Sequence, residues 1–234
     1  MSQPLPSTDL DEVLRQTRHL MLDFDGPVCT LFPHQGAATV AEHLRALIAA
    51  QPIQLPESIT KTADPLAVLF FATTLSADLA ARVESELSAE DLTAAATATP
   101  AGHIHDLISS CRESGRSVTV VSQISARAVN SYLERNSLDS AVGLVLARDR
   151  PSPLASKADL IESALTRLDT VPTACALVTA SPTTLEAARL AGTHTIGYTH
   201  ASGNYEALAA AGADALVPSL ADLVLRLRAR PLPN

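Results

Sequence analysis

Short apolar runs that alternate with helical stretches are the feature that most constrains the fold of this chain. Four runs have the composition of buried strands and two are weaker copies; they cover 19–25, 117–122, 141–147, 174–179, 193–198 and 215–217. Helical periodicity fills the intervals, at 104–114, 126–136, 158–168, 182–191 and 220–228. Buried strands that alternate with helices are typical of a parallel sheet covered on both faces. The pattern therefore predicts a doubly wound α/β fold.

One long interval departs from this alternation. Between the first two core strands lie three stripes of apolar side chains at helical spacing: Val40, Leu44, Leu47 and Ile48; Leu66, Leu69, Phe70 and Thr73; Leu79, Val83 and Leu87. Such stripes predict amphipathic helices. We therefore expect an α/β core of residues 1–32 and 99–234 and a small all-helical cap at 33–98. Proline-containing segments at 31–36 and 96–103 are the expected hinges.

Composition argues against several classes of partner. Only 3% of the residues are aromatic and the formal net charge is −8, which disfavours base stacking and binding to phosphate backbones. The three cysteines are widely spaced and lack the spacing of a metal site or a disulfide framework. The polar N-terminal stretch and the absence of a long apolar run predict a cytoplasmic protein with no membrane partner. A monomer or homodimer is expected.

Polar residues follow several of the predicted strands. In an open parallel sheet, ligands bind beyond the carboxyl ends of the strands, so these residues are the candidate site. They are Asp23, Asp25 and Gly26 after the first strand, Ser122 and Gln123 after the second, the loop 179–184, and Lys157 at the start of a helix. Two neighbouring carboxylates can supply a nucleophile and a general acid. We expect residues 23, 25, 122, 157 and 180 to converge on one cleft roofed by the cap.

At this point four stretches together resemble a known family. "LDFDGPVC" resembles the first motif of the haloacid dehalogenase superfamily, whose phosphatases carry Asp-x-Asp-Gly there. "VTVVSQIS" is similar to the second motif, Lys157 to the third, and "TASPTTLEAARLAG" to the fourth. The resemblance covers nearly the whole core, and the helical insertion lies where the family places a cap. The ordered set is more specific than any single motif.

The resemblance implies a phosphatase acting on a small phosphorylated metabolite. Asp23 would attack phosphorus to give an aspartyl-phosphate, and Asp25 would protonate the leaving oxygen and then activate water. Mg²⁺ would bridge Asp23, the Asp25 carbonyl and the phosphate. The residues implied to hold the phosphoryl group are Ser122, Gln123, Lys157 and Gly26. The cap would exclude water and select the substrate.

The chain departs from the family pattern in its fourth and third motifs. Ala180 and Thr184 stand where the family has aspartates, and Thr179 stands where it has glycine. Lys157 lies about two positions from its expected place, so Arg150 competes for that role. Because Mg²⁺ prefers carboxylate oxygens, we expect a weak or absent metal site. Gln123 also replaces the usual asparagine.

Two functions remain open at this stage. The first is an impaired phosphatase, favoured by the intact pair of Asp23 and Asp25. The second is a catalytically inactive protein that binds a ligand or a partner, favoured by the missing acids. Displacement of halide from carbon is disfavoured, because dehalogenases of the family lack the second aspartate.

Each candidate also has a purely structural interpretation. Asp before Gly-Pro is common in turns, Ser122 could cap the following helix, and Lys157 could be a solvated surface residue. For Ser181, followed by Pro182, the structural role of helix N-cap is the preferred prediction. Glu186 is predicted to be a surface charge.

Overall fold

The core of the molecule is a six-stranded parallel sheet with strand order β5-β4-β1-β6-β7-β8. The computed structural model describes residues 10–31, 36–149, 156–199 and 204–232. The strands are β1 (His19–Asp23), β4 (Ser117–Ser125), β5 (Leu144–Arg148), β6 (Cys175–Thr179), β7 (His194–Tyr198) and β8 (Ala215–Val217). The chain winds outward from β1 to one edge and then from β6 to the other. The predicted doubly wound α/β fold is confirmed.

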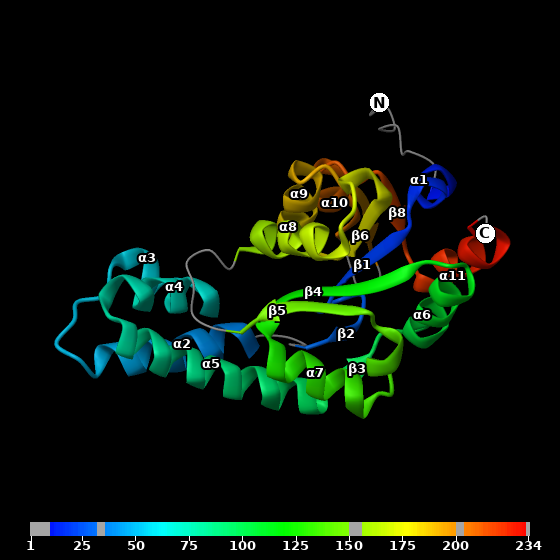
Figure 1. Ribbon diagram of the computed structural model, residues 1–234. Helices are drawn as coiled ribbons and strands as arrows, with labels where there is room; N and C mark the ends of the chain where they lie inside the picture. Colours follow the sequence, from blue (N-terminus) through cyan, green and yellow to red (C-terminus); the bar gives the residue numbers. More distant parts are fainter. Residues whose placement is uncertain (1–9, 32–35, 150–155, 200–203, 233–234) are drawn as a thin grey trace.

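Helices cover both faces of this sheet (Figure 1). One face carries α1 (Leu10–Gln16), α6 (Ile104–Glu113), α7 (Ala126–Arg135) and α11 (Leu220–Ala229), and the other carries α8 (Lys157–Leu168), α9 (Pro182–Leu190) and α10 (Tyr205–Ala210). Short 3-10 turns occupy Asp139–Ala141 and Pro172–Ala174. Among the helices described, none has the length and apolarity needed to cross a membrane.

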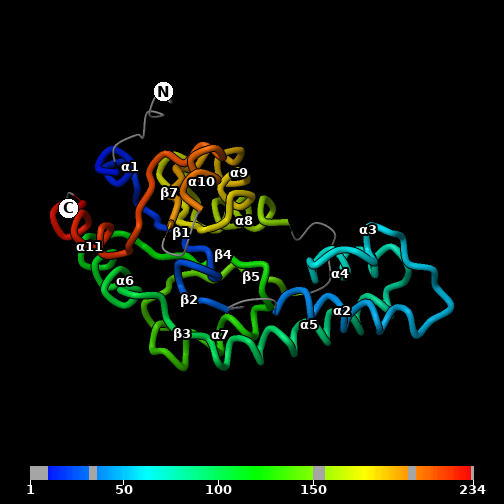
Figure 2. The backbone as a smooth tube through the Cα atoms, turned by 180° about the vertical axis from the view of Figure 1, so that it is seen from behind, coloured from blue at the N-terminus to red at the C-terminus, as the bar shows by residue number. Residues whose placement is uncertain are grey.

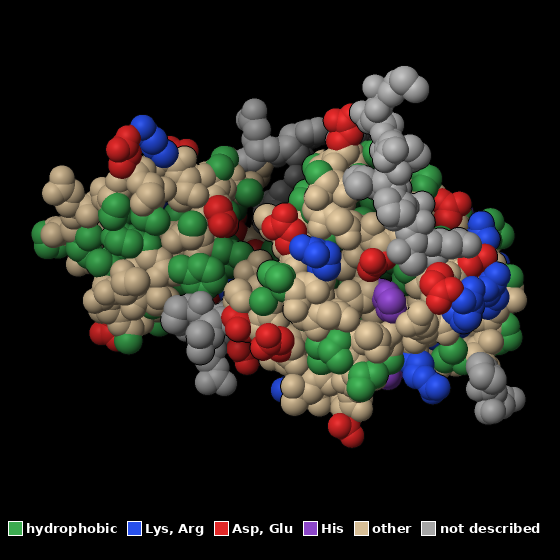
Figure 3. Space-filling model, turned by 90° about the horizontal axis from the view of Figure 1, so that it is seen from above, with side chains coloured by type: hydrophobic (Ala, Val, Ile, Leu, Met, Phe, Trp, Pro, Cys, Tyr) green, Lys and Arg blue, Asp and Glu red, His purple; other side chains and the backbone are tan. Residues whose placement is uncertain are grey.

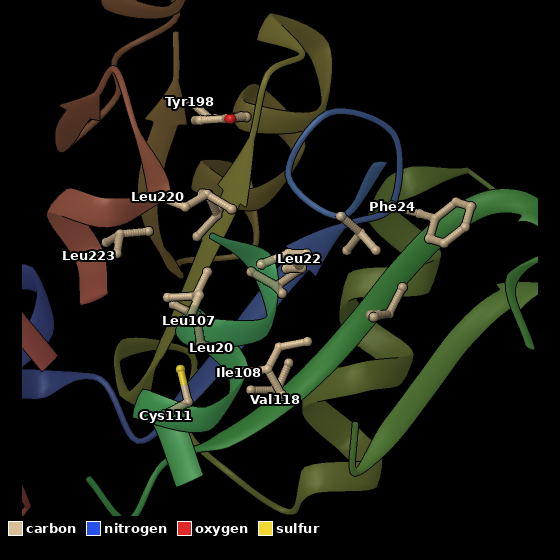
Figure 4. Packing of buried hydrophobic residues seen from close by; sticks show 14 of the residues in the cluster. Leu20, Leu22, Phe24, Leu107, Ile108, Cys111, Val118, Tyr198, Leu220 and Leu223 are labelled. Carbon is tan, nitrogen blue, oxygen red and sulfur yellow. The ribbon is translucent and has the colours of Figure 1, made fainter. Parts of the chain in front are cut away.

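The alternation of side chains along β1 explains the two-sided core. Leu20 and Leu22 point to one face, where they pack with Leu107 and Ile108 of α6 (Figure 4). Met21 points to the opposite face and joins the second apolar cluster. Each of these side chains is almost completely buried, and burying a leucine side chain stabilises the fold by about 1.5–3 kcal/mol. Sheet and helices are therefore held together through both faces.

The first motif leaves the sheet earlier than predicted. The strand was expected to run to residue 25, but β1 ends at Asp23. Phe24 and Gly26 belong to a tight turn in which the Gly26 N–H donates to the Cys29 carbonyl (2.7 Å) and the Cys29 N–H donates to the Phe24 carbonyl (3.1 Å). Gly26 has φ +103°, a conformation that favours glycine. Local turn chemistry therefore ends the strand.

A group of helices is inserted between β2 (Cys29–Thr30) and β3 (Thr99–Pro100), two short strands that pair antiparallel. We call residues 36–97 the helical insert. It contains α2 (Gly36–Ala49), α3 (Glu57–Thr60), α4 (Pro65–Leu75) and α5 (Ala77–Thr97). These helices enclose an apolar cluster of their own.

The predicted buried face of α4 was partly wrong. The periodicity indicated Leu66, Leu69, Phe70 and Thr73. The structure buries Val68, Leu69 and Ala72 and leaves the other three predicted residues half-buried. The sequence of α4 is apolar on nearly every side, so its periodicity does not select one face. Packing against α2 and α5 makes the choice instead.

Helix α5 belongs to both parts of the molecule. Its first half contributes Val83 and Leu87 to the cluster inside the helical insert, whereas Ala95 near its end joins the main core. Figures 1 and 2 show the helix passing from the insert to the side of α7 without a break. The insert is therefore carried on a helix that is anchored in the core.

Candidate active site

A cleft of about 250 Å³ lies between the carboxyl ends of the strands and the helical insert. The core lines it with Asp23, Asp25, Ser122, Gln123, Ile124, Arg148, Lys157, Ser181, Thr183 and Thr184. The insert lines it with Ala37, Asp64, Pro65, Leu66, Leu87 and Asp91. Viewed from above, the molecule shows two lobes, with acidic side chains near the line where they meet (Figure 3).

Asp23 is held at the floor of this cleft by two donors. The side chain lies at the end of β1, and the residue is 5% exposed. Lys157 Nζ donates to Asp23 Oδ1 (2.8 Å), and Thr179 Oγ1 donates to Asp23 Oδ2 (2.8 Å). The Thr179 hydroxyl oxygen also accepts from the Ser181 N–H (3.0 Å). The carboxylate is thus oriented from both sides by side chains of β6 and α8.

Lys157 reaches the site from the first residue of α8. The helix begins there because Ser156 and Asp159 form a capping box, in which each side chain accepts from the other's backbone N–H. The Lys157 side chain is only 12% exposed and ion-pairs with Asp23, so it is not a solvated surface residue. Arg150, the competing residue, lies outside the described residues.

Asp25 lies beside Asp23 and opens toward the cleft. Its Oδ1 accepts from the Leu31 N–H (3.0 Å), a contact made inside the turn that follows β1. Although the residue is exposed to the cleft, crowding by protein atoms raises the pKa of Asp25 through desolvation, and the charge of Asp23 adds to the rise. The hydrogen bond from the Leu31 N–H lowers the pKa of Asp25 and so opposes this rise. A raised pKa suits a carboxyl group that donates a proton.

The loop after β1 and the end of β4 supply different groups. Ser122 is 1% exposed, and its Oγ accepts from the Ile124 N–H (3.1 Å). It does not cap the next helix, because the N-cap position of α7 is Ser125. Gln123 lines the cleft. The Gly26 N–H is already donated to Cys29, and Gly26 lines a neighbouring cavity rather than the cleft.

The loop that leads into α9 forms a helix N-cap and contains no acidic side chain. Ser181 is the N-cap and accepts from the Thr184 N–H (3.3 Å), with Pro182 as the first helical residue, as predicted. Thr184 is buried in the wall of the cleft. Ala180 faces the neighbouring cavity with Asp25, so it does not converge on the cleft with the other candidates. Glu186 is exposed, as predicted.

These side chains do not fit a complete magnesium site. Within the described ranges, no group of three or more His, Cys, Asp or Glu residues is placed to hold a metal ion. Both oxygens of Asp23 are engaged by Lys157 and Thr179. Mg²⁺ needs near-octahedral oxygen ligands and is usually held by carboxylates. Alanine and threonine at positions 180 and 184 supply none.

Replacing the two neutral residues should create metal affinity. Asp25 borders both the cleft, with Thr184, and the neighbouring cavity, with Ala180. We therefore expect Ala180→Asp with Thr184→Asp to bind Mg²⁺ at least about tenfold more tightly than the parent, because the new carboxylates add hard oxygen ligands on either side of Asp25. Titration calorimetry with Mg²⁺ measures the change. Val171→Asp with Leu190→Asp adds the same charge at exposed positions and is the control. Equal gains in both double variants would show that the effect is only electrostatic.

The structure adds residues that the sequence interpretation missed. Arg148 and Asp91 line the cleft, and Thr179 donates to Asp23 although it was noted only as a departure from a motif. Arg148 was detectable, because it ends the apolar run of β5 as Asp23 ends β1. Asp91 lies inside a helix and carries no such signal.

Comparisons with known proteins place the fold. No family model and no curated protein matches this sequence. A haloacid dehalogenase-like hydrolase from Streptococcus pneumoniae has a TM-score of 0.65 and 15% identity over 90% of this chain and 98% of its own. A structure described as a predicted phosphatase from Clostridium acetobutylicum has a TM-score of 0.68 and 18% identity over 90% and 98%. CbbY from Rhodobacter sphaeroides, in complex with phosphate, has a TM-score of 0.63 and 18% identity over 88% and 96%.

Proposed function

We propose that this chain, whose fold is that of the haloacid dehalogenase-like phosphatases, is a phosphatase-type hydrolase of a small phosphate monoester. The observation that carries the proposal is the geometry around Asp23. Its carboxylate is oriented by Lys157 and Thr179 at the floor of a cleft, and a second carboxyl group, Asp25, lies beside it.

Asp23 and Asp25 divide the reaction into two displacements at phosphorus. In the first, an Asp23 oxygen bonds to phosphorus while the bond to the leaving oxygen breaks, and Asp25 gives that oxygen its proton. The product alcohol leaves and an aspartyl-phosphate remains. In the second, Asp25, now a carboxylate, takes a proton from water, whose oxygen displaces Asp23 and releases phosphate. The enzyme returns to its starting state.

Charge on the phosphoryl oxygens is offset by groups of the chain. The Lys157 ammonium ion lies beside the nucleophile and carries a positive charge to the reacting centre. The Ser122 hydroxyl lies in the same wall and can donate to a phosphoryl oxygen. Pre-oriented donors of this kind stabilise the transition state more than the bound substrate.

The helical insert limits what can react. Leu66 and Leu87 of the insert line the cleft with apolar surface, which reduces the room for water beside the reacting centre. A cleft of about 250 Å³ has room for a small phosphate ester. CbbY from Rhodobacter sphaeroides, of similar fold, was solved with phosphate and with xylulose-(1,5)bisphosphate, which supports a phosphorylated metabolite as substrate here.

The test is release of inorganic phosphate from a panel of small phosphate monoesters, measured with EDTA and across a Mg²⁺ titration. We expect at least one ester to be hydrolysed, with weak dependence on Mg²⁺ because the described residues do not form a full site for it. Acid quenching during turnover should trap an acid-stable, base-labile phosphoenzyme. No release from any ester at any Mg²⁺ concentration would contradict the proposal.

The second candidate is a ligand-binding protein without turnover. The observation that favours it is the neutral character of Ala180 and Thr184, which removes two acids from a loop of the phosphatase pattern. In that case phosphate esters bind in the cleft by calorimetry, Asp23→Asn alters the binding, and no phosphate is released.

A further inference from the structure

A buried ionic cluster forms part of the cleft wall. Arg148 at the end of β5 is 2% exposed, and its guanidinium ion-pairs with Glu84 through Nη1 and with Asp91 through Nη2. Both carboxylates come from α5, where they lie seven residues apart and hence on one face, two turns apart. Their side chains are 11% and 2% exposed. One side chain of the core, Arg148, therefore ion-pairs with two carboxylates on one face of α5.

The same cluster also holds the last residues of β4. Arg148 Nε donates to the Gln123 carbonyl (2.9 Å), and Asp91 Oδ2 accepts from the Ser125 N–H (2.9 Å). This end of β4, residues 122–125, where the register with β5 shifts, contains Ser122 and Gln123, two of the residues that line the cleft. Arg148 thus joins β5, the end of β4 and α5 in a single network.

The Arg148 ion pairs lie on the part of α5 that approaches the core. Val83 and Leu87 of this helix pack inside the helical insert, and Ala95 packs in the core. Asp91 lies between Leu87 of the insert's cluster and Ala95 of the core, and Glu84 lies two turns earlier in the helix, next to Val83. A contact at this point can restrict the orientation of the helical insert over the carboxyl ends of the strands.

Net stabilisation does not account for such a cluster. Removing charges from water costs free energy that a buried ion pair often fails to recover, and here one cation faces two anions. Desolvation raises the pKa of Asp91 and the charge of Glu84 adds to the rise, while Arg148 and the Ser125 N–H oppose it. In some proteins, buried charged groups of this kind enforce a single geometry instead.

We infer that Arg148 is a positioning residue, which fixes the helical insert over the cleft and residues 122–125 at the end of β4 through one network with Glu84 and Asp91. This inference goes beyond the proposed function and does not depend on turnover. Without the network, α5 keeps its anchor at Ala95, but the insert samples a range of positions over the strand ends.

The test is a distance distribution between two spin labels, one on the insert and one on the core. Lys61→Cys and Leu190→Cys provide exposed labelling sites. The Lys61 side chain is 75% exposed, and Leu190 is 83% exposed. The native cysteines are buried, and burial raises the pKa of Cys175 to about 11 and of Cys111 to about 12, so these thiols react slowly. In the otherwise unchanged protein we expect one narrow distribution.

The decisive variant combines Glu84→Gln, Asp91→Asn and Arg148→Met. It removes the ionic network without leaving an unpaired buried charge, so it should stay folded while the distribution becomes at least twice as broad. Arg148→Lys keeps the charge but cannot span both carboxylates, and it should broaden the distribution less. Hydrogen exchange at the Ser125 amide should accelerate in both.

Arg135→Met is the matched control, because Arg135 also binds α5, through the Ala95 carbonyl (2.6 Å), but away from the cleft. It should leave the distribution narrow. A folded triple variant with the parent's narrow distribution would overturn the inference. So would equal broadening by Arg135→Met, since the effect would then belong to any contact with α5. If the triple variant does not fold, an unchanged distribution in Arg148→Lys overturns it.

Discussion

Asp23→Asn is expected to lower phosphate release from small phosphate monoesters by at least about 10³-fold, because an amide oxygen is a far weaker nucleophile than a carboxylate. The amide keeps the shape of the side chain. Its oxygen can still accept from Lys157 or Thr179, the two donors that hold Asp23. The loss should therefore fall on the chemical step and not on the architecture of the cleft.

Steady-state kinetics on the preferred ester, with circular dichroism of both proteins, measures this effect. Asp25→Asn is the informative companion, because it leaves the proposed nucleophile, Asp23, intact and removes the proposed proton donor and base. It should also be slow, but a substrate with a good leaving group should still form the phosphoenzyme. Phosphate release by Asp23→Asn at the parental rate would place the nucleophile elsewhere in the cleft or assign the activity to a contaminant.

The sequence was sufficient for the fold and for the floor of the cleft. Buried strands read as uninterrupted apolar runs, so the end of each run locates the carboxyl edge to within a few residues. β1 ends at Asp23 rather than at residue 25, and β4 runs to Ser125 rather than to Ser122. The resemblance to the haloacid dehalogenase superfamily, based on ordered motifs, is confirmed at the level of the fold by the solved structures. Parallel strands bring their ends to one edge, which explains why this inference works.

Features that depend on tertiary packing were beyond the sequence. The resemblance placed Lys157 in one cleft with Asp23, but it did not predict their ion pair, which depends on the capping box at Ser156 that sets the start of α8. The ion pair of Arg148 with Asp91 joins residues 57 positions apart. No local pattern encodes such a pairing. It follows only once α5 is known to pass from the insert onto the core.

Phe24→Ala is expected to have the largest effect on stability. Phe24 separates the two aspartates of the first motif, and its ring is fully buried in the main core. It meets Tyr132 of α7 edge to face, with ring centroids 5.2 Å apart and planes at 88°. Truncating a buried phenylalanine removes apolar contacts and leaves a cavity, so we expect the free energy of unfolding to fall by about 3–5 kcal/mol. The edge-to-face contact adds to this loss.

The same substitution should also lower phosphate release, because the buried Phe24 side chain anchors the turn between Asp23 and Asp25 in the core. Urea unfolding measures the stability, and phosphate release by the folded fraction measures the site. Phe24→Leu keeps most of the volume and should cost less in both. Leu225→Ala, at a side chain that is 66% exposed, controls for apolar truncation and should change the free energy by less than about 0.5 kcal/mol. If Phe24→Ala lowers stability no more than this control, the ring does not anchor the motif, and the alignment of the two carboxylates must depend on their hydrogen bonds with Leu31, Lys157 and Thr179.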